Sequence, residues 1–290
     1  MSRFEGTKYF FKGLARSWTS SFAFIGVVLF VAAGLLGQFL IDPLRDIKVD
    51  STKIFSPPSL EHLLGTDHMG RDIFKQVILG SRDVLFSGLV TASIAISIGA
   101  VIGLLAGYAG GYIDGVLMTL TDIILLTPSF PLILILTSIF GKLDPVTVTA
   151  TASLTMWPGF ARGLRARIIQ VKGEAFVEAL WGLGFSRLRI LFREVLPLVA
   201  PYIAIEYIRL FRGAIFVVVG ISFLGLMPWS PYNWGTMLNV AYFQARSLFI
   251  PSGFWHWFSP LAAIIMTEWS FTQFARYLEE TWIPRLKAYE

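Results

Sequence analysis

The chain has 290 residues, of which 55% are hydrophobic and 15% are charged, and its mean hydropathy is +0.66. Soluble domains usually carry about 25% charged residues, so this composition excludes an ordinary soluble protein. The net charge of +5 comes from basic residues that flank apolar runs, which indicates membrane orientation and not nucleic-acid binding. The absence of cysteine excludes disulfides and thiolate metal sites.

Six apolar segments predict an all-α, polytopic membrane protein with six transmembrane helices. Two of the apolar runs, 20–41 and 84–113, contain no charged residue and exceed the roughly 20 residues that cross a bilayer core. The segment 146–161 alternates apolar and small polar residues like a strand, but a lone strand in lipid leaves its backbone unsatisfied, so we expect a helix. The expected spans are 20–41, 84–106, 116–140, 146–161, 198–226 and 256–276.

The distribution of Lys and Arg predicts the orientation of these spans. The N-terminal tail, the 160–193 segment and the C-terminal tail contain four, seven and three basic residues, against eight on the opposite side. The positive-inside rule therefore places both termini in the cytoplasm of a multi-pass protein of the cell membrane, with an uncleaved first helix. The expected parts are a cytoplasmic segment (1–19), the first span with an outer loop (20–83), a core (84–276) with a cytoplasmic loop (160–197), and a cytoplasmic tail (277–290).

The two longer outer segments carry their own signals. Apolar residues at helical spacing in 73–78 predict a short amphipathic helix at the outer interface. The 228–255 segment contains Trp229, Trp234 and Trp255, which is typical of an aromatic interfacial belt. Asp67 and Asp72 are expected to cap the outer loop and to pair with Arg71.

A charged stretch, FVEALWGLGFSRLRILFREVLP (176–197), interrupts the apolar pattern on the predicted cytoplasmic side. The spacing predicts a helix over 174–183 with an apolar stripe of Phe176, Ala179, Leu180 and Leu183. Gly184 is expected to end this helix in a left-handed conformation. Ser186 is expected to cap a second helix, in which Phe185 packs against Ile190. Pro197 and Pro201 predict a bend into the fifth span. Such a helical pair either rests on the bundle or serves as a handle for a partner protein.

The same stretch resembles the cytoplasmic EAA loop of ABC importer permeases, through Glu178, Ala179, Gly184, Leu196 and Pro197. It departs from that pattern at Leu180 and Glu194. LGTDHMGRD (64–72) resembles the GTD-x-x-GRD signature of the dipeptide/oligopeptide/nickel permease subfamily, second-subunit ("C") type. Further similar stretches follow in the same order: GLLAGYAGGYID (103–114), WPGFAR (157–162), SFLGL (222–226) and NWGTML (233–238). Thr119, where relatives commonly carry arginine, and the SFTQFARYLEE run depart from the subfamily.

The resemblance implies the type I ABC importer permease bundle and a pore subunit that is not an enzyme. Its implied partners are a second homologous permease, two ABC ATPases and an extracytoplasmic solute-binding protein, all at the lipid bilayer and without nucleic acid. The chain contains no G-x-x-x-x-G-K-[ST] motif, so we expect no cofactor here, with ATP and magnesium bound by the ATPases. The residues implied in ATPase coupling are Glu174, Glu178, Ala179, Leu180, Gly182, Gly184 and Arg187.

Charged residues inside the predicted spans are further candidates, because each costs roughly 2.5–3.5 kcal/mol at mid-membrane. Their spacing places Glu206, Arg209 and Arg212 on one helical face, where Glu206 and Arg209 can pair. Asp122 and Glu268 are possible partners of either arginine. The five residues form either a paired cluster inside the bundle or a pore lining for charged substrate.

The substrate and the rival mechanisms stay open at this point. The resemblance implies import of dipeptides or oligopeptides, with oligosaccharides as the alternative. An ion-coupled secondary transporter would instead use Asp122 or Glu268 for coupling. The histidines at 62, 68 and 256 lack metal-ligand spacing, so we expect no metal site, and no catalytic constellation indicates a membrane enzyme.

Overall fold

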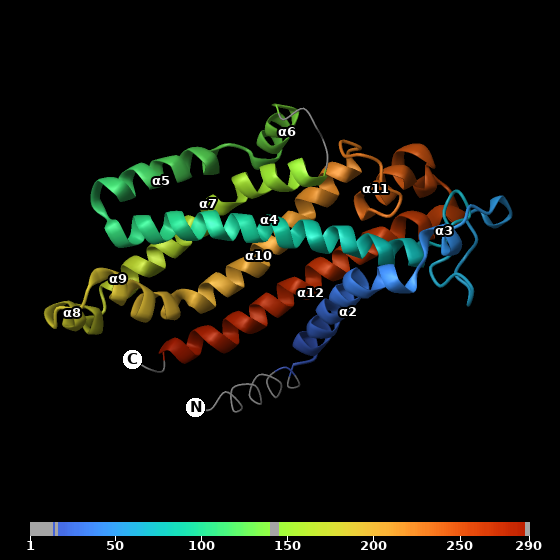
Figure 1. Ribbon diagram of the computed structural model, residues 1–290. Coiled ribbons are helices and arrows are strands. Elements are labelled where there is room, and N and C mark those ends of the chain that lie inside the picture. Colours follow the sequence, from blue (N-terminus) through green and yellow to red (C-terminus); the bar gives the residue numbers. More distant parts are fainter. Residues whose placement is uncertain (1–13, 15–16, 140–144, 288–290) are drawn as a thin grey trace. The chain divides into compact units, whose positions relative to one another are not determined.

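The computed structural model describes residue 14 and residues 17–139 and 145–287, and Figure 1 shows that they are almost entirely helical. Among these residues the only β-type pairing is an isolated bridge between Thr66 and Asp72. The predicted all-α class is therefore confirmed. The long helices are α2 (Trp18–Leu40), α4 (Ile73–Ala109), α5 (Gly111–Leu126), α6 (Ser129–Ile139), α7 (Pro145–Lys172), α10 (Leu196–Phe223) and α12 (Phe254–Lys287).

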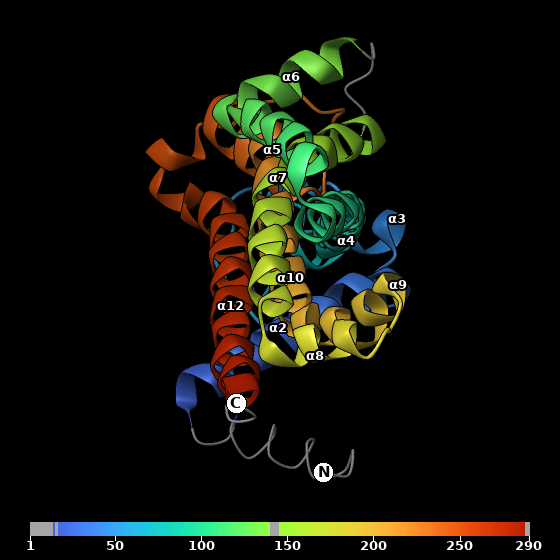
Figure 2. The ribbon, with the colours of Figure 1, turned by 90° about the vertical axis from the view of Figure 1, so that its left-hand side faces the viewer.

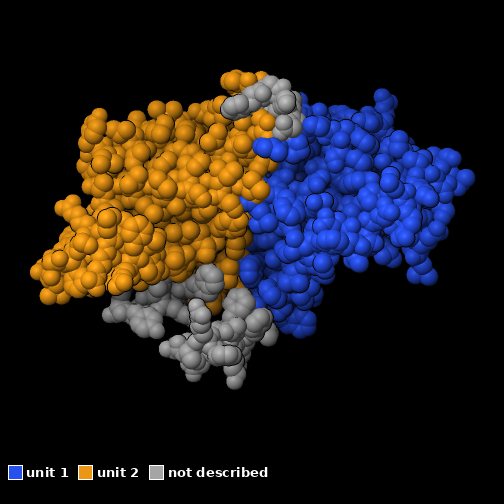
Figure 3. Space-filling model, in the orientation of Figure 1, with its two compact units in different colours: residues 1–89, 143–146, 212–274 blue, residues 90–142, 147–211, 275–290 orange. Residues whose placement is uncertain are grey.

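Shorter helical segments connect them. These are α3 (Pro43–Asp46), the 3-10 turn η1 (Ser51–Lys53), α8 (Ala175–Gly182), α9 (Arg187–Ile190), the π-helical turn η2 (Leu191–Val195), α11 (Trp234–Asn239), the π-helical turn η3 (Val240–Gln244), and the 3-10 turns η4 (Ser247–Phe249) and η5 (Pro251–Gly253). The chain forms two compact units, coloured separately in Figure 3. Unit 1 comprises residues 1–89, 143–146 and 212–274, and unit 2 comprises residues 90–142, 147–211 and 275–290.

The described part of every predicted span lies in helical structure or its adjoining turn, but the third span is broken. Thr127 is extended, at φ −83° and ψ 127°, because the following Pro128 disfavours a helical conformation before it. The resulting pair, α5 and α6, bends by 94°. By length and composition, α2 and α4 qualify as membrane-crossing helices among the described residues, and the bent pair adds a third if it counts as one span. Lys142 and the N-terminal basic residues lie outside the described residues.

The helix predicted for 146–161 is confirmed and extends to Lys172 as α7. Its buried hydroxyls bond to carbonyl oxygens of the preceding turn, as at Thr151 Oγ1 to Thr147 O (2.9 Å) and Thr155 Oγ1 to Ala152 O (2.9 Å). Because the hydroxyls of Thr151, Ser153 and Thr155 bond within their own helix, these small polar residues can be buried with their donors satisfied.

In unit 2, glycines on α4 allow α7 to approach closely. A Cβ placed on Gly103 would lie 2.7 Å from the carbonyl oxygen of Ala161, and one on Gly107 would lie 2.9 Å from Cβ of Ile168. Gly99, one turn earlier, faces the ring of Phe160 in the same way. Small residues at every fourth position are a common means of close helix packing in membranes.

In unit 1, aromatic side chains pack α2 against α11 and α12. The ring of Phe30 meets Trp234 and Phe271 edge-on, with centroids 5.8 Å apart in both pairs. Trp234 is 1% exposed and its Nε1 donates to the carbonyl oxygen of Val77 at 2.9 Å. The prediction that Trp234 belongs to an interfacial belt is therefore wrong, because this indole is used inside the fold; Trp229 is 61% exposed.

A separate amphipathic helix at 73–78 was also a wrong prediction. These residues form the first turns of α4, which runs without interruption from Ile73 to Ala109. The expected boundary at residue 83 therefore falls inside α4, and the loop that precedes this helix ends before Ile73. The alternation of polar and apolar residues does not follow burial here: Ile73 is fully buried, and the polar Gln76 is 1% exposed.

Candidate functional site

The segment with the strongest sequence signal forms a short helix ended by a glycine turn. α8 begins after Glu174, whose side chain makes no capping bond, and Leu183 caps its C-terminus. Gly184 has φ +80°, its N–H donates to Trp181 O at 3.0 Å, and the N–H of Phe185 donates to Leu180 O at 3.2 Å. These two bonds form a Schellman motif, which confirms the predicted left-handed C-terminal turn.

Most of the apolar stripe predicted for this helix is exposed. Within α8, which the structure describes in full, the buried residue is Val177, at 0% exposure. Phe176 is 42% exposed, Leu183 is 74% exposed, and Ala179 and Glu178 are also exposed. One valine therefore anchors the helix, and most of the predicted stripe faces outward.

The chain then passes from the turn into a long helix. The Ser186 side chain accepts a bond from the N–H of Arg189 (3.4 Å), which confirms the predicted cap of α9. The π-helical turn η2 follows directly, and its last bond runs from the N–H of Leu196 to Leu191 O. The widened turn lies immediately before Pro197, which cannot donate a helical hydrogen bond. α8 and α9 thus lie together at one end of α7 and α10 (Figures 1 and 2).

Polar contacts hold this end of unit 2 together. Lys172 Nζ, at the end of α7, donates to the carbonyl oxygen of Tyr108 at 2.8 Å and lies 5.3 Å from the centroid of its ring. The Tyr108 hydroxyl donates in turn to the carbonyl oxygen of Arg187 at 2.5 Å. A lysine at unsatisfied terminal carbonyls is a favourable helix cap. Trp181 and Phe185 line a cavity of about 520 Å³ beside these residues.

Two ion pairs join α5 to α7. Arg165 makes two bonds of 2.5 Å to the carboxylate of Asp114 through Nε and Nη2. Asp122 pairs with Arg162. The prediction that Asp122 could partner Arg209 or Arg212 is therefore wrong, because a closer arginine on α7 occupies its carboxylate.

The remaining charges of the predicted spans pair as the helical spacing suggested, with one addition. Arg209 Nη1 donates to Glu206 Oε1 at 2.6 Å, and its Nη2 donates to Glu279 Oε2 on α12 at 2.9 Å. Arg212 Nε donates to Glu268 Oε2 at 2.9 Å. The predicted Glu206–Arg209 pair is confirmed, and Glu268 is the partner of Arg212. Each member of the predicted cluster therefore has an ionic partner.

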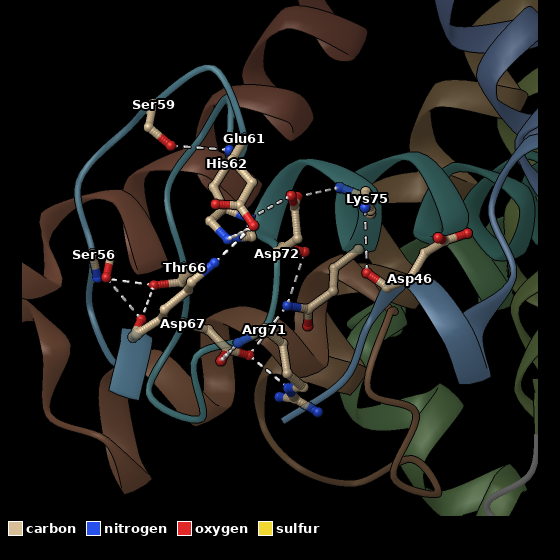
Figure 4. Close-up of polar contacts among 12 residues, drawn as sticks. Asp46, Ser56, Ser59, Glu61, His62, Thr66, Asp67, Arg71, Asp72 and Lys75 are labelled. Carbon is tan, nitrogen blue, oxygen red and sulfur yellow. Dashed lines mark hydrogen bonds and ion pairs between the residues drawn. The ribbon is translucent and has the colours of Figure 1, made fainter. Parts of the chain in front are cut away.

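The loop before α4 in unit 1 is organised around two carboxylates (Figure 4). Asp67 Oδ1 accepts the N–H groups of Met69 (2.8 Å) and Arg71 (2.9 Å), and its Oδ2 accepts from Arg71 Nε (2.8 Å). Burial raises the pKa of the Asp67 carboxyl, but the Arg71 charge and the backbone donors outweigh it and hold the pKa below its ordinary value. The predicted Asp67–Arg71 pair is confirmed.

The second carboxylate caps α4 and meets a histidine. Asp72 Oδ1 accepts the N–H of Lys75 at 3.0 Å, and its Oδ2 lies 2.9 Å from Nδ1 of His62. The prediction that Asp72 caps the loop is confirmed, while its side-chain hydrogen-bond partner is His62 and not Arg71. The other two histidines meet each other: the rings of His68 and His256 stack with centroids 5.1 Å apart.

Residues 99–267, more than half of the chain, match the family described as binding-protein-dependent transport system inner membrane component. The chain belongs to this family of membrane permeases. The resemblance to ABC importer permeases of the second-subunit type is therefore confirmed.

Among similar proteins, the dipeptide transport system permease protein DppC of Bacillus subtilis is 31% identical over 265 residues, covering 91% of this chain and 81% of the relative. The glutathione transport system permease protein GsiD of Pectobacterium atrosepticum is 30% identical over 280 residues, covering 96% and 91%. The oligopeptide transport system permease protein OppC of Bacillus subtilis is 30% identical over 204 residues, covering 68% and 66%.

The structure thus places several of the predicted coupling residues on one short segment, and it shows further residues that hold this segment in place. Glu178, Ala179 and Gly182 lie exposed on or beside α8, and Gly184 forms the turn. Sequence reasoning missed the residues that fix this turn to the bundle, namely Tyr108, Lys172 and Val177. The positions of Tyr108 and Lys172 at the ends of two long helices were the available signal, because terminal carbonyls need donors.

Proposed function

We propose that this permease forms half of the translocation pore of an ATP-driven importer for dipeptides or oligopeptides. The names of its relatives, which include dipeptide and oligopeptide permeases, support this substrate class. The complex would contain a second homologous permease, two ATPase subunits and an extracytoplasmic solute-binding protein. In this complex the permease is a pore subunit, and the separate ATPases hydrolyse ATP with bound magnesium.

One observation carries the proposal: α8 exposes its apolar side chains while its base is fixed to the bundle. Phe176 and Trp181 are each 42% exposed, although a helix resting on its own bundle would bury such residues. Glu178 lies exposed on the same short helix. An ATPase cleft that accepts α8 would bury this surface, with Glu178 as a polar contact and Ala179 as a close-packing position.

The connection from α8 to the pore supports a mechanical role. Motion of α8 would pass through the Gly184 turn and α9 into α10, and through Lys172 and Tyr108 to the ends of α7 and α4. Closure of the ATPase pair would then rock these helices as rigid bodies and open the pore toward the outside. The ATPase can drive this motion only if it binds the two pore states with different affinity.

The proposed topology has six crossings, with both termini and the 160–197 loop in the cytoplasm. It is supported by the excess of Lys and Arg in these regions and by the helical structure of the six apolar segments. The bent α5–α6 pair serves as the third crossing, and the broken helix at Pro128 is tolerated where neighbouring protein satisfies its backbone.

Ion pairing argues against an ion-coupled carrier. Such a transporter needs an intramembrane acid that is free to exchange its ion during the cycle. Asp122, Glu206 and Glu268 each hold an arginine partner in this structure. Charge neutralisation by fixed partners fits a bundle whose energy comes from another subunit.

The coupling assignment is tested by reversing one exposed charge in the reconstituted complex. Glu178→Arg should abolish the stimulation of ATP hydrolysis by peptide-loaded binding protein, while membrane insertion and the amount of permease stay unchanged. Glu280→Arg is the matched control, because Glu280 is an exposed glutamate on α12. Gly184→Pro should have the same effect as Glu178→Arg, since proline cannot adopt φ +80°. Normal stimulation in both α8 variants would refute the assignment.

The substrate class needs a separate measurement. The binding protein encoded with the permease should gain thermal stability from dipeptides or oligopeptides and not from oligosaccharides, because a ligand stabilises the state that it binds. Stabilisation by oligosaccharides alone would refute the peptide assignment and leave the coupling role intact.

A further inference from the structure

Three potential metal ligands from distant parts of the sequence meet in unit 1. Asp67 and His68 lie in the loop before α4, and His256 lies in the first turn of α12. Each offers one donor atom, and these three atoms lie within 4.8 Å of one another. Asp67 is 1% exposed and His256 is 3% exposed, so the group is largely shielded from solvent.

Each of the two imidazoles has a ring nitrogen available for metal coordination. Nδ1 of His68 is buried and has no hydrogen-bond partner among the described residues. Nδ1 of His256 lies 2.7 Å from the hydroxyl of Ser247, which leaves Nε2 for another contact. A hydrogen bond to the remote ring nitrogen is the usual device that fixes the tautomer and orientation of a metal-binding histidine.

We propose that Asp67, His68 and His256 bind a first-row divalent transition-metal ion, with zinc as the best-matched ion. Two imidazoles and one carboxylate are a donor set that suits zinc and its neighbours and does not suit magnesium or calcium, which prefer oxygen ligands. The bound ion ties the loop before α4 to the start of α12.

Only a small adjustment is needed to close the site. Donor atoms around a tetrahedral zinc are about 3.4 Å apart when its bonds are about 2.1 Å long, so the widest separation, at most 4.8 Å, closes by up to about 1.4 Å. Asp67 must also free one acceptor position. Its longest bond, 3.1 Å from Gln76 Nε2, is the one to exchange, because that amide also donates to the carbonyl oxygen of Asp72.

The test measures metal stoichiometry on the full chain. The permease is purified in detergent through a tag without histidine, stripped with a chelator, dialysed against micromolar zinc, and analysed by elemental mass spectrometry. We expect one zinc per chain for the wild type and at least tenfold less for His68→Asn. His62→Gln is the matched control and should keep one zinc per chain, because His62 lies in the same loop and outside the three-residue group.

A second readout guards against misfolding of the variants. Zinc should raise the melting temperature of the wild type and of His62→Gln, and should leave that of His68→Asn unchanged. His256→Gln should match His68→Asn in both measurements. Magnesium at the same concentration should produce no shift. A wild type that binds no zinc, or His68→Asn that binds as much zinc as the wild type, would overturn the proposal.

Discussion

The N–H of Phe185 donates to the carbonyl oxygen of Leu180 at 3.2 Å, and Gly184 forms the corner between them at φ +80°. This bond closes the exposed end of α8 with backbone atoms. The geometry depends on a residue that tolerates the left-handed region, where any side chain is strained.

Gly184→Ala should therefore loosen this turn. The left-handed conformation costs a residue with a Cβ roughly 1–2 kcal/mol, and a Cβ here meets no described atom within 4 Å, so the cost is conformational. Hydrogen exchange of the Phe185 amide should accelerate by about tenfold. Gly182→Ala is the control, because it lies inside α8 in equally open space and should strengthen the helix by up to about 1 kcal/mol. Equal exchange in the two variants would show that φ is not the controlling factor.

Gly103→Ala should destabilise unit 2 through α4 and α7. The added methyl would lie 2.7 Å from the carbonyl oxygen of Ala161, a backbone atom that cannot rotate away. Overpacking of this kind costs about 1–3 kcal/mol, which should appear as a lower midpoint of denaturation in detergent. Gly159→Ala makes the same change on α7 where no described atom lies within 4 Å, and it should leave the midpoint unchanged or raised. Similar losses in both variants would contradict the close-packing role of Gly103.

Local signals in the sequence were sufficient to predict the helices and the turn that ends α8. The apolar runs, Gly184 and Ser186 each act within a few residues, where helix length and backbone preference decide the conformation. The start of α4 was misread because an amphipathic pattern does not say whether these residues form a separate helix on a membrane or the first turns of a longer helix.

Contacts between residues that are distant in the sequence could not be predicted without the three-dimensional structure. Asp122 was matched with the wrong arginines, since spacing along α10 gives no information about α7. His68 and His256 are far apart in the chain, and no local rule brings their rings together. The sequence pattern left open whether the α8 stripe rests on the bundle or faces a partner. In the structure the stripe is exposed or half-exposed, and Val177 is the buried residue of α8.

The stability of unit 1 should fall in mild acid, and His68 should contribute to this loss together with His256, whose pKa burial lowers to about 4. Burial lowers the pKa of the His68 imidazole in the folded state, while an unfolded histidine titrates at about 6.5. The neutral His68 side chain therefore contributes fully to the free energy of unfolding above about pH 6.5. This contribution is lost as the pH falls toward the pKa of His68 in the folded state. In the presence of chelator, the melting temperature should decrease between about pH 7.5 and pH 5, and His68→Asn should reduce this slope. Parallel profiles for the two proteins would refute the assignment to His68.

Exchanging Arg212 and Glu268 should distinguish packing from a pore contact. Arg212→Glu places two carboxylates where a bond of 2.9 Å now joins α10 to α12, and it should cost roughly 1–3 kcal/mol of stability. The double variant with Glu268→Arg restores opposite charges, so stability and peptide uptake should both recover to near the wild-type level. Denaturation midpoints and uptake in reconstituted vesicles measure the two properties on the same preparations. Recovery of stability without recovery of uptake would show that the positions of these charges matter to the substrate, and the pair would then belong to the translocation route.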